Sequence, residues 1–425
     1  MKIRYHGVVA HSTFVLLVYI LLLAGTTACD KQDEQVEITF TSWRIDDVAE
    51  MDRINALYTQ KHPDITIRFD SYDPMIYDSI AMGKLSKGNG ADLIFLWSYD
   101  KGRNYYDKGY LYELNNVIPN LSSYGQIPLN AWTTGNGLTY ALPSVGVTQG
   151  VYYHKSFFTK YNIQEHATWD DFLAACEKIH NGGETAIAQG ANDGWTLGRI
   201  VYNTLGATFY GGETARKALI AGTAKLTDSN FLDAYNAVNS LKKYLPQAFA
   251  TMGYEDARQL FATGKAAMFV GGSWEISVFE GLGLTSSQIG WFAPPVKKAG
   301  DKIQYCFHVD AGIAVNRKSK HLEETLEYLK WLGGTEYANA LMTELPGFFS
   351  YTPGTQITGN SHAQEMYNTI PVSDLTVRLM FEKLNSGSPG GDALLSQSLE
   401  GMLKGIYTPQ VAAAWVQNQL AVYYK

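Results

Sequence analysis

The chain has 425 residues, 46% of them hydrophobic and 18% charged, with a formal net charge of −7 at pH 7. The acidic balance argues against nucleic acid as a partner, because phosphates are bound by clusters of Lys and Arg. Only three cysteines are present, so a disulfide framework is not expected. Cys176 and Cys306 are expected to be two separately buried thiols, with a pair in an oxidising compartment as the alternative.

The first predicted element is a short apolar segment behind a basic start. Lys2 and Arg4 precede an aliphatic run at residues 15–23, and small residues follow up to Cys29. This order is typical of a secretory signal peptide. The run is too short to span a hydrocarbon layer of about 30 Å. The polar stretch at residues 29–35 then reads as a flexible tether.

The end of this segment resembles a bacterial lipobox, in which the signal is cut just before a cysteine that is then lipidated. The resemblance implies that residues 1–28 are removed and that Cys29 carries the acyl chains. The mature protein would then be anchored to the outer face of a membrane, in the periplasm or at the cell surface. The alternative is cleavage at a nearby small-residue site, with Cys29 incidental.

Strands and helices alternate in the part that follows. Residues 36–42 alternate as a half-buried strand does, and the apolar spacing at residues 46–61 predicts a helix. Residues 65–70 predict a second strand. The almost continuous apolar run at residues 91–97 predicts a strand that is covered on both faces, and residues 101–108 follow it as a helix. Repeated strand–helix–strand units favour a doubly wound α/β sheet.

Beyond residue 138 the alternation continues with two interruptions. Residues 138–147 and 149–154 are predicted as a pair of strands that is broken by proline and glycine. Residues 291–296 contain two prolines, and strand character resumes at residues 305–316. Proline and glycine are expected at such positions where a chain passes between two lobes.

The last part of the chain predicts mostly helices. The apolar spacing indicates helices at residues 321–331 and 335–344, and a glycine turn follows at residues 345–347. Residues 363–424 are expected to be mostly helical, with a flexible loop at residues 386–392.

Four stretches of sequence follow one another in a characteristic order. They are EITFTSWRIDDVAEMDRINALYTQKHPDITI from residue 37, ADLIFLWSYDKGRNYYDKGYLYELN from residue 91, LTYALPSVGVTQGVYYHKSFFTKYNIQEHATWDDFLAACEKI from residue 138, and FATGKAAMFVGGSWEI from residue 261. A further stretch, GIYTPQ, starts at residue 405. In this order they resemble an extracellular solute-binding protein of a bacterial ABC importer, of the type that includes maltose- and oligosaccharide-binding proteins.

The resemblance implies an α/β fold of the periplasmic-binding-protein type, in which each of two lobes is a sheet flanked by helices and the ligand cleft lies between them. The implied N-lobe takes residues 36–145 with 305–345, and the C-lobe takes residues 146–296 with 348–425. A crossover at residues 297–304 joins them. Hinge closure on the ligand is then the signal that an importer recognises. The implied partners are a small-molecule ligand and an ABC permease, with no cofactor, for a monomer.

Residues beyond the carboxyl ends of strands are the candidates for the cleft, since ligands of open α/β sheets bind there. Trp274 stands where the family often places a tryptophan that stacks on sugar, and the NDGW segment is similar to segments in relatives. The candidate ligand-binding residues are Trp43, Arg44, Trp97, Tyr99, Asp193, Trp195, Trp274, Glu275, Asp310 and Phe348. Flat rings cover the apolar faces of a sugar and charged groups bond its hydroxyls, so we expect a carbohydrate ligand, most simply an oligosaccharide.

Other interpretations stay open beside this one. Arg44 could pair with Asp46 or Asp47 at the surface, and the protein could bind a solute other than a sugar. A glycan-active enzyme would need two carboxylates across a bond, and nothing in the sequence pairs Glu275 with Asp310. Catalytic motifs such as G-x-S-x-G and H-E-x-x-H are absent from the sequence. The histidines lack metal spacing, so we expect neither an enzyme nor a metal site.

A third class of protein, a lipid-anchored adhesin or structural surface protein, would share the tether but would not need tryptophans at strand ends. Iron-binding relatives use tyrosinates, and this chain has the tyrosine pairs Tyr105–Tyr106 and Tyr152–Tyr153. Adjacent residues on a strand point to opposite faces, so Tyr152 and Tyr153 could hardly bind one metal ion together.

Overall fold

The computed structural model describes residues 35–164, 167–357 and 359–424. The predicted signal segment at residues 1–28, the lipidation candidate Cys29 and the tether up to residue 34 lie outside the described residues. Within the described part of the chain, none of the helices combines the length and the apolar character that crossing a bilayer requires.

A continuous path of paired strands runs through the molecule in the order β2-β1-β3-β8-β4-β6-β5. The strands are β1 (Val36–Ser42), β2 (Ile65–Ser71), β3 (Leu93–Trp97), β4 (Leu142–His154), β5 (Thr185–Ala188), β6 (Ala266–Gly272), β7 (Ile289–Phe292), β8 (Gln304–Val315), β9 (Phe349–Ser350) and β10 (Asp374–Thr376). Pairing is parallel in β2-β1-β3 and antiparallel on both sides of β8. The predicted α/β class is therefore confirmed, with a mixed sheet.

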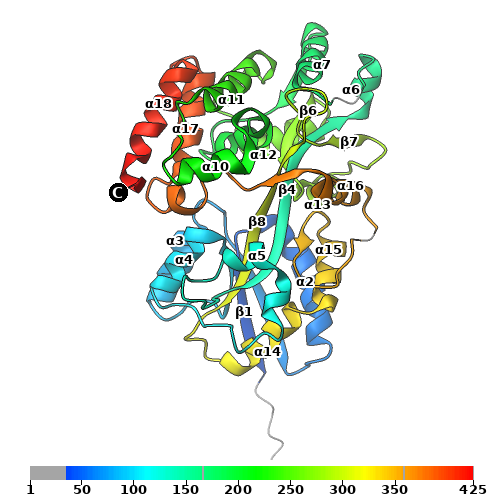
Figure 1. Ribbon diagram of the computed structural model, residues 1–425. Helices are drawn as coiled ribbons and strands as arrows, with labels where there is room; N and C mark the ends of the chain where they lie inside the picture. The colour runs from blue at the N-terminus through cyan, green and yellow to red at the C-terminus, as the bar shows by residue number, and fades with distance from the viewer. Residues whose placement is uncertain (1–34, 165–166, 358, 425) are drawn as a thin grey trace, which may run out of the picture.

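Strands β4 and β8 run through both halves of the molecule (Figure 1). The first residues of β4 pair with the end of β8, as Leu142 does with Ile313, while the last residues pair with β6 and β7. We call the half around β1, β2 and β3 the N-lobe, and the half around β5, β6 and β7 the C-lobe. The exact residue limits of the two lobes stay a prediction.

The predicted pair of strands at residues 138–154 is wrong, because the structure has the single strand β4 there. Its pairing with β8 shifts register between Pro143 and Val145 and again between Val145 and Gly146. These irregularities accommodate the proline and let the strand continue. Gly146 is required at the bend, since a Cβ there would lie 2.3 Å from the Tyr351 hydroxyl.

Helices cover both lobes (Figure 1). The N-lobe has α2 (Val48–Thr59), α3 (Tyr77–Ser86), α4 (Tyr99–Asp107), α5 (Gln126–Asn130), α14 (Leu322–Leu332) and α15 (Thr335–Glu344). The C-lobe has α6 (Lys155–Lys160), α7 (Trp169–Asn181), α8 (Asn203–Leu205), α9 (Ala207–Tyr210), α10 (Gly212–Ile220), α11 (Ser229–Ser240), α12 (Tyr254–Ala262), α13 (Glu275–Gly281), α16 (Ser361–Thr369), α17 (Gly391–Leu403) and α18 (Pro409–Leu420), with a π-helix at Leu197–Tyr202. The predicted helices of the N-lobe are confirmed to within two residues at either end.

Cys176 and Cys306 are both buried and free, which confirms two separate thiols. The C-terminal part is helical in α16, α17 and α18, but between α16 and α17 it forms only 3-10 turns and β10. That part of the helical prediction is wrong, because β10 pairs with the start of β8 and draws the chain into the sheet.

Candidate functional site

A cavity of about 360 Å³ lies between the two lobes. Its walls come from the ends of β1 and β3 in the N-lobe and from α12, the end of β6 and the π-helix in the C-lobe. Eight of the ten candidate residues line it, namely Trp43, Arg44, Trp97, Asp193, Trp195, Trp274, Asp310 and Phe348. The rule that ligands bind beyond the strand ends therefore leads to the cavity for four of these residues, since Trp43, Arg44, Trp97 and Trp274 end or closely follow strands.

Two tryptophans form the N-lobe wall. Trp43 follows β1 and Trp97 ends β3, and because these strands are parallel neighbours their carboxyl ends lie together. The two rings stack with centroids 3.6 Å apart and planes 13° from parallel. The ammonium group of Lys101 lies 5.2 Å from the Trp97 ring centroid. This side of the cavity therefore offers an aromatic surface with a cation beside it.

Arg44 lines the cavity but is held by its own helix turn. Its Nε and Nη2 atoms donate hydrogen bonds of 2.6 and 2.7 Å to the carboxylate of Asp47, and its guanidinium lies 5.1 Å from the Phe348 ring centroid. Burial lowers the pKa of Arg44, but the charge and hydrogen bonds of Asp47 outweigh it and the net direction is upward. Arg44 therefore both lines the cavity, as expected of a ligand-binding candidate, and pairs with Asp47, as in the alternative, although this pair is largely buried rather than at the surface.

Trp274 forms the C-lobe wall, where the chain leaves β6. Its Nε1–H donates to the Tyr254 hydroxyl at 3.0 Å, and that hydroxyl donates to Glu275 at 2.6 Å. Behind the ring, a Cβ at Gly272 would lie 2.0 Å from a ring carbon. The glycine thus lets the indole lie flat over the strand, and Tyr254 fixes its rotation.

Glu275 and Tyr99 do not line the cavity. Glu275 is 0% exposed, and its carboxylate contacts the Arg258 guanidinium at 2.9 Å and accepts the hydrogen bond from Tyr254. Tyr99 is half-buried, with its ring centroid 6.4 Å from those of His308 and Phe381. Glu275 therefore supports the residues behind Trp274, and Tyr99 packs between the lobes.

Asp193 and Trp195 reach the cavity from the segment before the π-helix. One oxygen of Asp193 accepts a hydrogen bond from the backbone N–H of Tyr254, at the start of α12. The ring of Trp195 lies 5.0 Å from that of Tyr254 at an angle of 48°. Both residues line the cavity, and both also contact Tyr254, which holds Trp274.

The structure adds ionisable residues that the sequence did not suggest. They are Asp46, Asp73, Asp78, Lys101, Arg199, Tyr254, Glu255, Arg258 and Arg378. Asp46 and Lys101 lie in the first turns after β1 and β3, so the rule applied to Trp43 and Trp97 could have found them. Arg199 lies in a π-helix and Arg378 follows β10, and no periodic pattern predicted either element.

Arg258 joins the lobes through its carboxylate partners. It lies on α12, where its guanidinium contacts Glu255 at 2.8 Å and Glu275 at 2.9 Å within the C-lobe. It also contacts Asp46 of the N-lobe at 3.4 Å. Burial lowers the pKa of Arg258, but the neighbouring carboxylates raise it above its ordinary value. One buried cation is thus shared between the two sides of the cleft.

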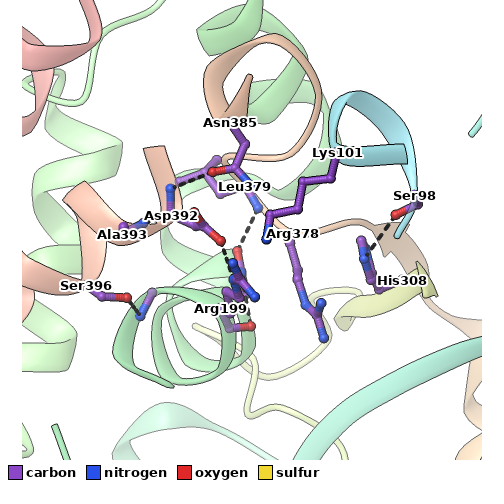
Figure 2. A network of polar contacts seen from close by, with 12 residues as sticks. Ser98, Lys101, Arg199, His308, Arg378, Leu379, Asn385, Asp392, Ala393 and Ser396 are labelled. Carbon is purple, nitrogen blue, oxygen red and sulfur yellow. Dashed lines mark hydrogen bonds and ion pairs between the residues drawn. The ribbon is translucent and has the colours of Figure 1, made fainter. Parts of the chain in front are cut away.

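A network of polar contacts lies at the end of the cavity that Lys101, Arg199 and Arg378 line (Figure 2). Arg199 forms an ion pair with Asp392, while Lys101 contacts Asp78 at 3.2 Å. His308 is 0% exposed, with its Nε2 atom 3.5 Å from the Ser98 hydroxyl.

Burial and the surrounding cations decide how the pKa values of His308 and Asp392 shift in this network. Burial and then the charges of Arg378, Arg199 and Arg216 lower the pKa of His308 well below its usual range. Burial raises the pKa of Asp392, but Arg199 and Lys101 hold it below its usual range. His308 is therefore neutral and Asp392 ionised at pH 7.

Comparison with known proteins places this chain in a family. A family model described as bacterial extracellular solute-binding protein matches residues 43–339. The chain is 27% identical over 284 residues to an uncharacterized ABC transporter extracellular-binding protein of Pyrococcus horikoshii, covering 65% of this chain and 63% of that protein, less than two thirds of its length. It is 24% identical over 320 residues to the multiple sugar-binding protein of Streptococcus mutans, covering 72% of this chain and 73% of that protein.

Among solved structures, a chitin oligosaccharide binding protein matches with a TM-score of 0.77 at 21% identity, covering 92% of this chain and 99% of that chain. This likeness confirms the predicted two-lobe fold. The family consists of binding proteins rather than enzymes, in agreement with the expectation from the sequence. The match of the family model spans most of the chain, and the protein therefore belongs to the bacterial extracellular solute-binding proteins.

Proposed function

We propose that the protein is the lipid-anchored substrate-binding component of an ABC importer and that it binds a carbohydrate, most simply an oligosaccharide. The observation that carries the proposal is the pair of aromatic walls, with Trp43 and Trp97 on one side of the cavity and Trp274 and Trp195 on the other. The names of the Streptococcus mutans relative and of the structural neighbour refer to sugars and support the same ligand class.

The chemistry of the walls suits a sugar ring. A pyranose has apolar faces that stack on flat aromatic rings and a rim of hydroxyls that exchange hydrogen bonds with charged groups. The cavity supplies both, since Asp310, Arg378 and Asp193 lie beside the indoles. The division into an N-lobe of residues 36–145 with 305–345 and a C-lobe of residues 146–296 with 348–425 is part of the proposal. Closure of these lobes would enclose the sugar between the walls.

The anchor and the partner belong to the same proposal. Lipidation of Cys29 would hold the protein at the outer face of a membrane, within reach of an ABC permease. Expression of the full chain with a radiolabelled fatty acid tests this. We expect label on the wild-type protein and none on the Cys29→Ala variant, which should also leave the membrane fraction. Equal labelling of both variants would exclude Cys29 as the anchor.

A thermal-shift screen tests the ligand class. The soluble part from residue 35 onward is heated with a panel of mono- and oligosaccharides, and with amino acids, polyamines and ferric iron as controls. A ligand at 100 times its Kd adds about 2.7 kcal/mol to the free energy of unfolding, which raises the midpoint visibly. We expect a shift with one class of sugar.

Two variants connect the shift to the cavity. Trp274→Ala should lose the sugar-induced shift, because it removes one wall of the cavity. Trp415→Ala is the matched control, since Trp415 is a partly exposed tryptophan on α18 outside the cavity. A rise of the unfolding midpoint with a non-sugar solute alone would agree with a role in transport but would exclude a carbohydrate as the ligand.

A further inference from the structure

Three cations from three separate segments line the same cavity. Lys101 comes from α4 of the N-lobe, Arg199 from the π-helix and Arg378 from the chain after β10 (Figure 2). They are close enough that the charge of Arg199 adds to the effect of burial in lowering the pKa of both Lys101 and Arg378. Mutual repulsion of this kind in a buried place is unfavourable unless an anion offsets it.

Arg378 is the member of this group with unsatisfied hydrogen-bonding capacity. Its side chain is 6% exposed, and its contact with the Asp310 carboxylate, at 3.6 Å, is longer than a hydrogen bond. Its Nε–H has no hydrogen-bond partner among the residues that the structure describes. A buried guanidinium normally satisfies its five N–H donors, and this one, which lines the cavity, leaves at least one of them without an acceptor.

Two of the nearby carboxylates already pair with cations of this group. Asp392 is engaged by Arg199, and Asp78 accepts hydrogen bonds from Lys101 and Tyr105. Asp310 faces Arg378 directly, but at 3.6 Å it lies beyond hydrogen-bond distance, so Arg378 is the cation of this group without a close carboxylate partner. His308 is held neutral beside the cluster and adds no negative charge.

Each of two cations also lies beside one of the aromatic walls. The Lys101 ammonium is 5.2 Å from the Trp97 ring centroid, and the Arg378 guanidinium carbon is 5.9 Å from that of Trp274. A sugar ring stacked on either indole therefore brings its ring substituents next to a cation. Lys101 belongs to the N-lobe, whereas Arg199 and Arg378 pack with the C-lobe, so one bound anion would touch both lobes.

We propose that Lys101, Arg199 and Arg378 bind an anionic substituent of the ligand, a carboxylate or a sulfate on a sugar ring, and that the solute is an acidic oligosaccharide. This inference rests on the proposed function. Arginine suits such a group because its planar N–H donors match the paired oxygens of a carboxylate. The competing possibility is that Arg378 donates to the hydroxyls of a neutral sugar.

Isothermal titration calorimetry with matched ligand pairs separates these two possibilities. The probes are oligogalacturonates, glucuronic-acid-bearing xylo-oligosaccharides and sulfated chondroitin disaccharides. Each is measured beside its carboxyl-reduced or desulfated form, so that carboxylate and sulfate are distinguished. We expect at least one acidic probe to bind roughly tenfold or more tightly than its neutral form, which is the preference that charged hydrogen bonds give.

The variants Arg378→Gln and Lys101→Gln assign the preference to the cluster. Each should lower the ratio of the affinity for the acidic probe to that for its neutral form by roughly tenfold or more, because the acidic probe loses a charge pair while the neutral form loses at most a hydrogen bond to a hydroxyl. Arg103→Gln is the matched control, because it removes one positive charge from the same helix as Lys101 and lies outside the cavity. Circular dichroism of each variant verifies folding. If Arg378→Gln does not fold, Lys101→Gln alone tests whether the cluster causes the preference for the acidic probe.

Equal affinity for an acidic probe and its neutral form, or binding of neutral sugars alone, would overturn this inference and leave the proposed function intact. Loss of the preference in Arg103→Gln as well would show a general charge effect and would also overturn it. The absence of binding to acidic and neutral sugars alike would overturn the proposed function together with the inference.

Discussion

The indole rings of Trp43 and Trp97 stack face to face, with centroids 3.6 Å apart. Each ring is at least nine-tenths buried, at 5% and 6% exposure. One face of each ring is occupied by the other ring in this stack, so a ligand in the cavity can contact only the remaining surface of the pair. Because the two residues end neighbouring strands, the stack also connects β1 to β3 at the cleft.

Substitution of one ring should disturb both. We expect Trp97→Ala to lower the free energy of unfolding by about 3–5 kcal/mol, as large aromatic deletions do, and to weaken sugar binding. Urea unfolding and calorimetry measure the two effects. Trp97→Phe, which retains a ring to stack, should recover much of both. An alanine variant with wild-type affinity would show that the stack is only part of the core.

A glycine controls the position of the second wall. Gly272→Ala would place a Cβ 2.0 Å from the Trp274 ring, so the indole must move. We expect reduced sugar affinity and a changed tryptophan fluorescence spectrum in the unliganded protein. Gly135→Ala is the control, because a Cβ there meets nothing within 4 Å. Unchanged binding in Gly272→Ala would mean that the orientation of Trp274 does not matter for the ligand.

The ion pair between Asp46 and Arg258 should favour approach of the lobes. In Asp46→Asn the guanidinium retains Glu255 and Glu275, so the C-lobe should keep its structure. We expect the unliganded variant to be more open, with a larger radius of gyration in small-angle X-ray scattering. Asp52→Asn, on the surface of α2, removes the same charge as a control. Identical scattering from the wild type and Asp46→Asn would count against an interlobe role.

The buried His308 predicts a pH dependence of stability. Burial, Arg378, Arg199 and Arg216 lower its pKa in the folded state, so below about pH 6.5 the unfolded chain binds the proton that the folded one rejects. Stability should therefore fall as the pH falls below that value, with a slope approaching about 1.4 kcal/mol per pH unit from this residue.

Urea unfolding of the wild type and of His308→Gln over the range from about pH 5 to 7.5 measures this slope. The variant should show a shallower dependence, while His180→Gln, an exposed histidine on α7, should match the wild type. Burial also lowers the pKa of His154, so this histidine accounts for part of the pH dependence that remains in His308→Gln. Parallel curves for the wild type and His308→Gln would contradict the assignment.

Most of the aromatic part of the site could be predicted from the sequence. Trp43, Trp97 and Trp274 follow strands whose apolar patterns are clear, and the position of strand ends in an α/β fold is a general rule. Glu275 meets the same rule, yet it turns inward because Arg258 and Tyr254 bind its carboxylate. Such a choice depends on side chains from another helix, which a local pattern does not contain.

The cationic part of the site was not predicted for a related reason. Arg378 is positioned by β10, a strand of three residues whose only pattern is its pairing with β8. Arg199 lies in a π-helix next to Gly198, which packs against Ser396 of α17. The sequence predicted two strands where β4 is one. Whether Pro143 ends a strand depends on the bulge in the pairing with β8, which the local sequence does not contain.

The place of β8 between β3 and β4 has a consequence for how the protein is made. Without β8, the ladder β2-β1-β3 and the ladder β4-β6-β5 share no paired strand. β8 is synthesised after all six of these strands. The edge of β3 therefore stays unpaired while most of the C-lobe is being synthesised. Pairing at this distance along the chain is slow and leaves an edge exposed. The sheet of the N-lobe therefore stays incomplete until β8 has been synthesised, whichever lobe begins to fold first.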